Sequence, residues 1–162
     1  VLYVGGPDAM ISTQRRFNGL CKGLRERFGD AASIRRYSGE YTIACGREMA
    51  RRFLDEGMPA TAIFASSDEI AIGMIEVLRE RGISIPEDLS LIGFDDVSPL
   101  HLFAPPVTAI RQPVRTIGQR ALALLLETNW QESKSLATEE LVPVEIVVRK
   151  SVAPPSTHNK QR

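Results

Sequence analysis

The sequence predicts an α/β fold in which a parallel sheet is flanked by helices. Short apolar runs alternate along the chain with longer segments of helical periodicity, a pattern typical of repeated strand–helix units. Glycine follows several of the helical segments, where it favours the end of a helix. The 162 residues, 43% hydrophobic and 25% charged, are enough for one globular domain with a sizeable core.

The first strand–helix unit begins at the start of the sequence. Residues 1–4 form an apolar run that ends at the Gly-Gly-Pro of residues 5–7, which predicts a short buried strand. Residues 14–28 predict a helix that ends at Gly29. The apolar residues on one face of this helix are Phe17, Leu20, Cys21, Leu24 and Phe28.

The second unit and the third strand follow the same pattern. Residues 32–37 predict a strand that is less apolar than the first, and therefore nearer an edge of the sheet. Residues 42–56 predict a helix with Gly57 at its C-terminal cap. Its inward residues are Ile43, Ala50, Phe53 and Leu54. Residues 61–65, Thr-Ala-Ile-Phe-Ala, predict a clearly buried strand.

The third helix has two candidate N-caps, Ser67 and Asp68, because either side chain can accept a hydrogen bond from the first helical turn. We expect this helix over residues 68–81, ending at Gly82. Its apolar side comprises Ile70, Ala71, Met74, Val77 and Leu78. Residues 89–94 predict the fourth strand.

The C-terminal third adds a helix between two extended segments. A short helical turn is predicted at residues 98–103 and an extended piece at residues 107–110. Pro113 suits the first turn of a helix that we expect to continue to about residue 128. The apolar face of this helix is Val114, Ile117, Ala121, Leu124 and Leu125. Residues 141–148 predict a final strand, after which a polar, proline-rich tail is expected to fray from Ser151 onward.

The charge balance and the start of the chain narrow the function classes. Lysine and arginine number 20, as do aspartate and glutamate, whereas a nucleic-acid-binding domain usually has a basic excess, so we expect no DNA contact from these residues. No apolar run approaches the ~20 residues that span a membrane, and no signal-peptide pattern opens the sequence. Because Val1, not Met, opens an apolar run, we expect the sequence to be a piece of a longer protein.

Neither the cysteines nor the histidines form a cluster that predicts a metal site. Cys21 and Cys45 are predicted to be small apolar members of helix faces, and a disulfide between them stays open as an alternative. His101 lies among apolar residues and His158 lies in the tail, so the sequence offers no metal-ligand spacing. We therefore expect no metal and no other cofactor.

Polar side chains follow each predicted strand. In open parallel sheets ligands bind beyond the carboxyl ends of the strands, where the strand–helix loops gather. In chain order the residues at these positions are Asp8 and Arg16, Glu40 and Tyr41, Ser66 to Asp68, Asp95 and Asp96, and Arg111 and Gln112. Carboxylates, a guanidinium, an amide and an aromatic ring suit a polyol, because they match adjacent hydroxyls and the apolar face of a sugar ring. We therefore expect a binding site for a small polyol.

Taken singly, each of these residues has a simpler interpretation. Asp68 can be only an N-cap, and Asp95 and Asp96 can be turn residues. Arg16 can be a solvated helix residue and Tyr41 a surface aromatic. The convergence of all of them on one rim is what favours a binding site.

Several blocks of sequence, in order, resemble segments of the lactose-repressor type (LacI/GalR) of transcriptional regulators. They are Gly5-Gly6-Pro7 with Arg16 to Leu20; residues 59–73, PATAIFASSDEIAIG; residues 83–96, ISIPEDLSLIGFDD; residues 105–113, PPVTAIRQP, with Ile117-Gly118; and residues 144–154, VEIVVRKSVAP. The resemblance covers essentially residues 1–155. It implies a periplasmic-binding-protein-like fold of type I, a cytoplasmic regulator and no enzymatic activity.

The resemblance also assigns roles to particular residues. It implies that Arg16, Asp95 and Gln112 bind the effector, together with Tyr41 as a stacking aromatic and with Ser67 and Asp68. It places Ile72, Leu102 and Phe103 near the seam of a homodimer. Members of the family bind hexoses, pentoses, disaccharides, nucleosides or purines, so the effector is expected to be a sugar or related polyol, with a nucleoside or purine as alternatives.

The resemblance divides the chain into parts. Residues 1–111 would be most of the C-terminal subdomain, 112–130 a crossover helix that packs on the N-terminal subdomain, 131–150 a return strand and 151–162 a flexible tail. The N-terminal subdomain and the helix-turn-helix that binds operator DNA would lie upstream, so this chain would hold one wall of the effector cleft. Without that subdomain we expect the crossover helix to be displaced, to bury its apolar stripe in an oligomer, or to exchange its amide protons rapidly.

Three other functions remain open. A periplasmic sugar-binding protein of an ABC transporter shares the fold and would show the same rim. An enzyme would require a triad such as Ser66 or Ser67 with His101 and Asp95, but no G-x-S-x-G turn frames either serine. The chain can also serve only for dimerisation, if it holds too little of the cleft to bind an effector.

Overall fold

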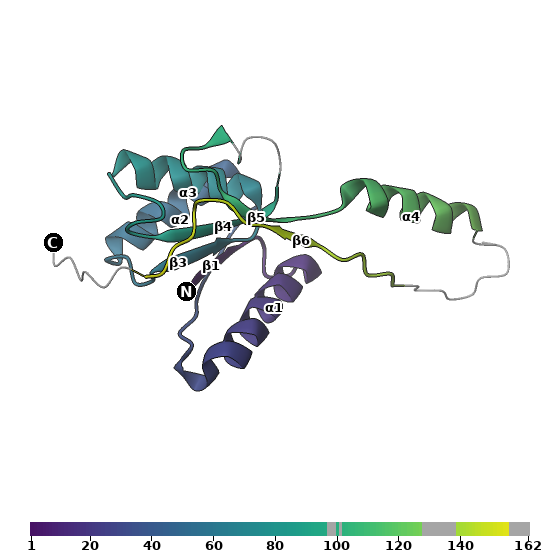
Figure 1. Cartoon of the computed structure of the whole chain (residues 1–162), viewed down its shortest axis with the longest axis horizontal. Helices are drawn as coiled ribbons and strands as arrows, with labels where there is room; N and C mark the ends of the chain where they lie inside the picture. The colour runs from purple at the N-terminus through teal and green to yellow at the C-terminus, as the bar shows by residue number, and fades with distance from the viewer. Residues whose placement is uncertain (97–99, 101, 128–138, 156–162) are drawn as a thin grey trace.

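Six strands form one sheet in the computed structural model, which describes residues 1–96, 100, 102–127 and 139–155. The strands are β1 (Leu2–Gly5), β2 (Arg35–Ser38), β3 (Ala62–Ala65), β4 (Ser90–Asp95), β5 (Thr108–Arg111) and β6 (Glu145–Val147). Their order is β2-β1-β3-β4-β5-β6, and Figure 1 labels all of them except β2. β1 to β5 pair in parallel and β6 pairs antiparallel to β5. The predicted parallel sheet is therefore confirmed, with one antiparallel strand added at its edge.

Four helices accompany the sheet in the described residues: α1 (Ile11–Phe28), α2 (Ile43–Asp55), α3 (Asp68–Glu80) and α4 (Val114–Glu127). α2 and α3 together cover one face of the sheet, and α1 lies on the opposite face (Figure 1). α4 extends away from the sheet. No helix in the described part of the chain is both long and apolar enough to cross a membrane.

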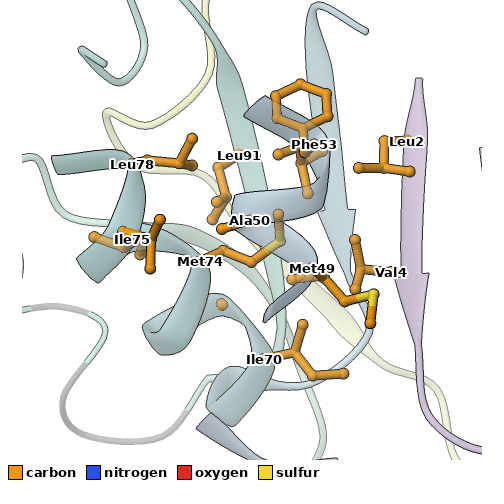
Figure 2. Close-up of a cluster of buried hydrophobic side chains, with 14 of the residues drawn as sticks. Leu2, Val4, Met49, Ala50, Phe53, Ile70, Met74, Ile75, Leu78 and Leu91 are labelled. Carbon is orange, nitrogen blue, oxygen red and sulfur yellow. The ribbon is translucent and has the colours of Figure 1, made fainter. Parts of the chain in front are cut away.

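The main core lies between the sheet and the α2–α3 pair. Figure 2 shows side chains from β1, α2, α3 and β4 packed against one another there. The large members that are almost fully buried include Leu2, Val4, Phe53, Ile70, Met74, Leu78 and Leu91. The helical apolar faces that the sequence predicts for α2 and α3 are therefore the faces that they bury.

Two glycines allow α2 and α3 to pack closely. A Cβ atom on Gly73 would overlap the carbonyl oxygen of Ile43, and a Cβ atom on Gly46 would overlap that of Ile70. Both clashes are with backbone, which cannot rotate away as a side chain can. The separation of the two helices therefore depends on these two positions.

The other face of the sheet is aromatic and only partly covered. Tyr3 of β1 makes edge-to-face contacts with Phe17 of α1 and Phe64 of β3, at centroid distances of 5.2 and 5.7 Å. A mostly apolar pocket of about 530 Å³ lies between α1 and the sheet, with Leu20 and Ile92 among its lining residues. One layer of the fold is thus much looser than the other.

α4 exposes four members of its predicted apolar stripe, Val114, Ile117, Ala121 and Leu125, whereas Leu124 is half-buried. Leu122 and Leu126, which lie outside that stripe, are also exposed. α4 extends away from the sheet (Figure 1), and the three outcomes expected for this helix stay predictions. Arg120 forms a paired hydrogen bond with Glu140 on the returning segment.

Residues 151–153 are ordered against the sheet, which corrects the predicted start of a frayed tail. Ser151 is fully buried; its hydroxyl donates to the Leu91 carbonyl (2.6 Å) and accepts from the Thr108 amide (2.8 Å). The Ser90 hydroxyl likewise bonds both the carbonyl and the amide of Ala153. Polar composition misled the prediction because these polar groups bind strands β4 and β5, not water. Residues 156–162 lie outside the described residues.

Other boundaries differ by a few residues. α1 begins at Ile11, three residues before the predicted start. The prediction missed this start because the N-cap residue, Met10, has no capping side chain. β2 starts at Arg35, three residues later than predicted, and a short 3-10 helix at Gly29–Ala31 precedes it. The last strand is limited to residues 145–147. The turn predicted at 98–103 includes residues 98, 99 and 101, which lie outside the described residues.

Candidate functional site

Arg16, Asp95 and Gln112 meet at the carboxyl end of the sheet, as the sequence predicts. The Gln112 side-chain amide donates to the Asp95 carboxylate at 2.5 Å, and the Arg16 guanidinium lies 3.9 Å from the same oxygen. Asp95 ends β4, Gln112 follows β5, and Arg16 lies on α1, so three separate segments supply the cluster. β4 and β5 pair so that Asp95 lies beside Arg111. This register brings Asp95 close to Gln112, the residue after Arg111.

The Arg16 side chain is held in place from several sides. It donates a 2.5 Å hydrogen bond to the Ser66 carbonyl, and its guanidinium lies 3.8 Å from the centroid of the Phe94 ring. The Tyr41 ring is 5.9 Å away. Only 19% of the Arg16 side chain is exposed, so its interpretation as a solvated helix residue is wrong. An arginine stacked on an aromatic ring keeps its donors in a fixed direction.

Tyr41 lies beside this cluster with its ring against the backbone. A Cβ atom on Gly6 would overlap the Tyr41 ring, so glycine at this position makes room for it. The Tyr41 hydroxyl pairs with the Thr13 hydroxyl at 2.7 Å, and Tyr3 donates to the Thr13 carbonyl. Burial raises the pKa of Tyr3 above its ordinary value. The ring of Tyr41 is therefore fixed before any ligand arrives.

Ser67 and Asp68 lie deeper than the other predicted site residues. Ser67 is the N-cap of α3, because its hydroxyl accepts from the Ile70 amide at 3.3 Å. Asp68 is the first helical residue, and the two are 6% and 2% exposed. Of the two predicted caps, Ser67 is thus the one that caps. Contact of either residue with an effector stays a prediction.

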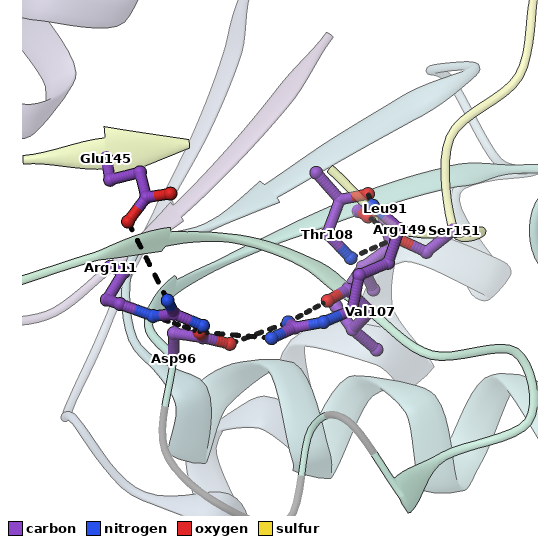
Figure 3. A network of polar contacts seen from close by, with 8 residues as sticks. All are labelled: Leu91, Asp96, Val107, Thr108, Arg111, Glu145, Arg149 and Ser151. Carbon is purple, nitrogen blue, oxygen red and sulfur yellow. Dashed lines mark hydrogen bonds and ion pairs between the residues drawn. The ribbon is translucent and has the colours of Figure 1, made fainter. Parts of the chain in front are cut away.

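Asp96 forms a second cluster that the sequence interpretation missed. Its side chain is only 2% exposed and accepts hydrogen bonds from Arg149 at 2.6 and 3.0 Å and from Arg111 at 2.8 Å, as Figure 3 shows. Hydrogen bonds from Arg149, with a further contribution from Arg111, lower the pKa of Asp96 despite its burial. Arg149 also donates to the Val107 carbonyl at 2.6 Å. The R-x-S segment at residues 149–151 is the sequence signal that marks this cluster.

The backbone at Asp95 and Asp96 is unusual. Their φ angles are +104° and +63°, a region that residues with a Cβ atom seldom occupy. The interpretation of this pair as turn residues therefore holds for the backbone. Because of that turn, the two carboxylates take different partners: Asp95 contacts Arg16 and Gln112, whereas Asp96 contacts the two other arginines.

The residues predicted near a dimer seam differ in exposure. Leu102 is 76% exposed, whereas Ile72 and Phe103 are half-buried against the core. His101, which the alternative catalytic triad requires, lies outside the described residues. Cys21 and Cys45 are both free thiols. No group of three His, Cys, Asp or Glu side chains within the described ranges could hold a metal ion.

Comparison with known proteins identifies the family. The family of periplasmic binding protein-like domains matches residues 1–152. The HTH-type transcriptional repressor PurR of Mannheimia succiniciproducens is 34% identical over 150 residues, which cover 93% of this chain and 45% of the relative. The chain thus spans less than half of that relative's length.

Two solved structures share the fold over most of the chain. The lac repressor dimer bound to operator and an anti-inducer has a TM-score of 0.81 and 27% identity, covering 94% of this chain and 52% of that one. A LacI family regulator from Enterococcus faecium with bound ribose has a TM-score of 0.81 and 29% identity, with coverage of 96% and 57%. The chain therefore belongs to the periplasmic binding protein-like domain family and, within it, to the LacI/GalR type.

Proposed function

We propose that this chain forms one wall of the effector cleft of a LacI/GalR-type transcriptional regulator, and that Asp95, Arg16 and Gln112 bind the effector. The observation that carries the proposal is the meeting of these three side chains at the carboxyl end of the sheet. A carboxylate accepts from hydroxyls, a guanidinium donates, and an amide does both, so the cluster can pair with adjacent hydroxyls of a small polyol. Tyr41 and Phe94 supply aromatic surface beside it.

The ligand class follows from this chemistry. A sugar or the ribose of a nucleoside presents several hydroxyls on one side and C–H groups on the other, which matches carboxylate and aromatic neighbours. The ribose bound to the Enterococcus faecium regulator is consistent with this class. A purine has ring nitrogens and N–H groups instead of hydroxyls, so Asp95 would accept from an N–H group while Arg16 and Gln112 donate to ring nitrogens.

The regulatory role follows from the relatives, which are repressors. A ligand that contacts both walls of the cleft stabilises the closed state, and shifts the equilibrium only by its difference in affinity between the two states. DNA binding would then belong to a helix-turn-helix outside this chain, and dimerisation to the surface around Ile72, Leu102 and Phe103. The exposure of Leu102 and the dimeric lac repressor structure support the latter. We place the regulator in the cytoplasm and assign it no catalytic step.

Isothermal calorimetry of the full-length gene product with hexoses, pentoses, nucleosides and purines tests the proposal. Asp95→Ala removes a charged hydrogen-bond acceptor, which costs about 1.5–3 kcal/mol, or roughly 10- to 150-fold in affinity. We expect Arg16→Ala to weaken binding to a similar degree. Glu56→Gln is the matched control, because Glu56 also binds arginines but lies near the start of β2, at the other end of the sheet. Unchanged affinity in both site variants would overturn the assignment.

The same titrations on the 162-residue chain alone decide whether one wall of the cleft is sufficient. Binding by the full-length protein and none by this chain would mean that the chain serves for dimerisation when separated. Turnover of any compound in the panel would instead favour an enzyme.

A further inference from the structure

We propose that Asp96 is a positioning residue that holds the Asp95 carboxylate toward the effector site by tying the end of β4 to both segments that lead to and from α4. The inference rests on the proposed role of Asp95 in effector binding. It adds a link between that site and the position of α4.

The backbone of the acidic pair requires such a restraint. Asp95 and Asp96 both have positive φ angles although neither is glycine. Residues with a Cβ atom stay in this region only where the surrounding contacts hold them there. A change in the φ angle of either residue would turn the Asp95 carboxylate away from Arg16 and Gln112.

The contacts that hold the pair converge on the buried Asp96 carboxylate. Arg149 binds it with two nitrogens in a forked arrangement, and Arg111 binds it from the other side (Figure 3). Paired charged hydrogen bonds of this kind fix direction as well as distance. Arg149 in turn is anchored at the Val107 carbonyl and, through its own amide, at the Thr108 hydroxyl. The acidic pair is therefore braced against β5.

The two arginines mark the two segments that connect the sheet to α4. Arg111 is the last residue of β5 and precedes Gln112, after which α4 begins at Val114. Arg149 follows β6, on the segment that returns from α4. Arg111 also lies 3.7 Å from Glu145 of β6, which joins the outgoing and returning segments. The Asp96 carboxylate therefore contacts both the outgoing and the returning segment.

This geometry couples the position of α4 to the candidate site. Gln112, the partner of Asp95, is adjacent in sequence to Arg111, a partner of Asp96. Movement of the outgoing segment therefore changes the contacts of both carboxylates together. Conversely, a ligand that moves the Asp95 carboxylate would change the contacts with the same two segments.

Nuclear magnetic resonance of the full chain tests the inference without any ligand. Arg149→Gln removes the forked contact with Asp96 but lies far in sequence from Asp95 and Gln112. We expect the side-chain amide signals of Gln112 and the carboxyl carbon signal of Asp95 to shift. Methyl signals of Met74 and Leu78 should stay in place, because these α3 residues are fully buried in the apolar core between the sheet and the α2–α3 pair. Arg149→Lys, which keeps the charge, should return the signals part of the way.

Glu56→Gln is again the matched control, because Glu56 accepts from Arg52 and Tyr37 yet lies away from the site. It should leave the Gln112 and Asp95 signals unchanged. If Arg149→Gln loses its dispersed methyl signals, Arg111→Gln decides, since the Arg111 side chain is 47% exposed and its replacement spares the core. Because Arg111 is adjacent to Gln112, only the Asp95 carboxyl signal is read in that variant.

Unchanged Gln112 and Asp95 signals in a folded variant would overturn the inference, even if calorimetry finds an effector at Asp95. Shifted signals in a protein that binds no compound of the panel would support the link and overturn only the proposed function. The two proposals therefore fail separately.

Discussion

The α2–α3 pair and α4 have similar sequence patterns and opposite surroundings. Both regions carry an apolar stripe at helical spacing. In α2 and α3 that stripe is buried against β1, β3 and β4, with Phe53 and Leu78 fully inaccessible. In α4 most of it is exposed, with Val114 at 69% and Leu125 at 57%. Periodicity therefore predicts which face of a helix is apolar, and not what covers that face.

The difference has an energetic meaning. Burying a large aliphatic side chain contributes about 1.5–3 kcal/mol, so the stripe of α2 and α3 stabilises the domain. The stripe of α4 makes no comparable contribution while it is exposed. In the full-length protein we expect it to be covered by the N-terminal subdomain that the family resemblance places upstream.

Hydrogen exchange should show the largest contrast. Amides of α2 and α3 open only with global unfolding, which requires about 5–15 kcal/mol in a typical domain. Amides of α4 should exchange orders of magnitude faster, because the helix projects from the body. Exchange mass spectrometry on a verified monomer measures this directly. Strong protection of the α4 amides in that monomer would show that α4 is packed in solution and does not differ from α2 and α3 in this way.

Matched leucine substitutions in α3 and α4 should give the next largest effect, on the free energy of unfolding. Leu78→Ala creates a cavity in the core and should lower the free energy of unfolding by about 2–5 kcal/mol. Leu126→Ala removes the same atoms from an exposed position and should change it by about 0.5 kcal/mol or less. Urea unfolding followed by circular dichroism compares them. Equal losses would mean that α4 is packed in solution.

Glycine-to-alanine substitutions in α3 and α4 test the same difference in packing with a single added methyl group. Gly73→Ala places a methyl group against the α2 backbone and should cost about 1–3 kcal/mol. Gly118→Ala meets no atom within 4 Å and should instead favour α4 by up to about 1 kcal/mol, through helix propensity. Thermal unfolding and helix content test the two variants. A neutral Gly73→Ala would show that the α2–α3 contact is looser than described.

Low pH should weaken the contacts of Asp96, which join the body of the domain to the segments that lead to and from α4. Hydrogen bonds from Arg149 lower the pKa of folded Asp96, so its charge stabilises the fold above the ordinary carboxyl pKa of about 3.9. That contribution is lost as the pH falls through the lowered value. The difference in unfolding free energy between wild type and Asp96→Asn should therefore narrow below about pH 4. A difference that is constant from pH 7 to pH 3 would show that the Asp96 charge does not matter.

Local patterns were enough to predict most elements of the body. Apolar runs located β1, β3 and β4, and glycines with positive φ at Gly57 and Gly82 ended helices where expected. The start of α1 was missed because no side chain caps it. The antiparallel direction of β6 depends on where the chain returns from α4, which periodicity does not contain.

The site was predictable to the extent that it follows from strand ends. Arg16, Asp95 and Gln112 were found because parallel strands finish at a common edge. The Asp96–Arg149 contact was missed because Arg149 follows the antiparallel strand β6, and the rule for the ends of parallel strands does not place it beside Asp96. Ser67 and Asp68 were placed at the rim because they follow the third strand, and in the effector site by resemblance. Ser67 caps α3, and contact of either residue with an effector stays a prediction.

A structure of the full-length protein with its effector tests the central claim most directly. Ligand hydroxyls should lie at hydrogen-bond distance, about 2.6–3.2 Å, from the Asp95 carboxylate and the Gln112 amide, with Arg16 donating to the same molecule. An effector bound instead in the apolar pocket between α1 and the sheet, with the Asp95–Gln112 contact unchanged, would contradict the claim.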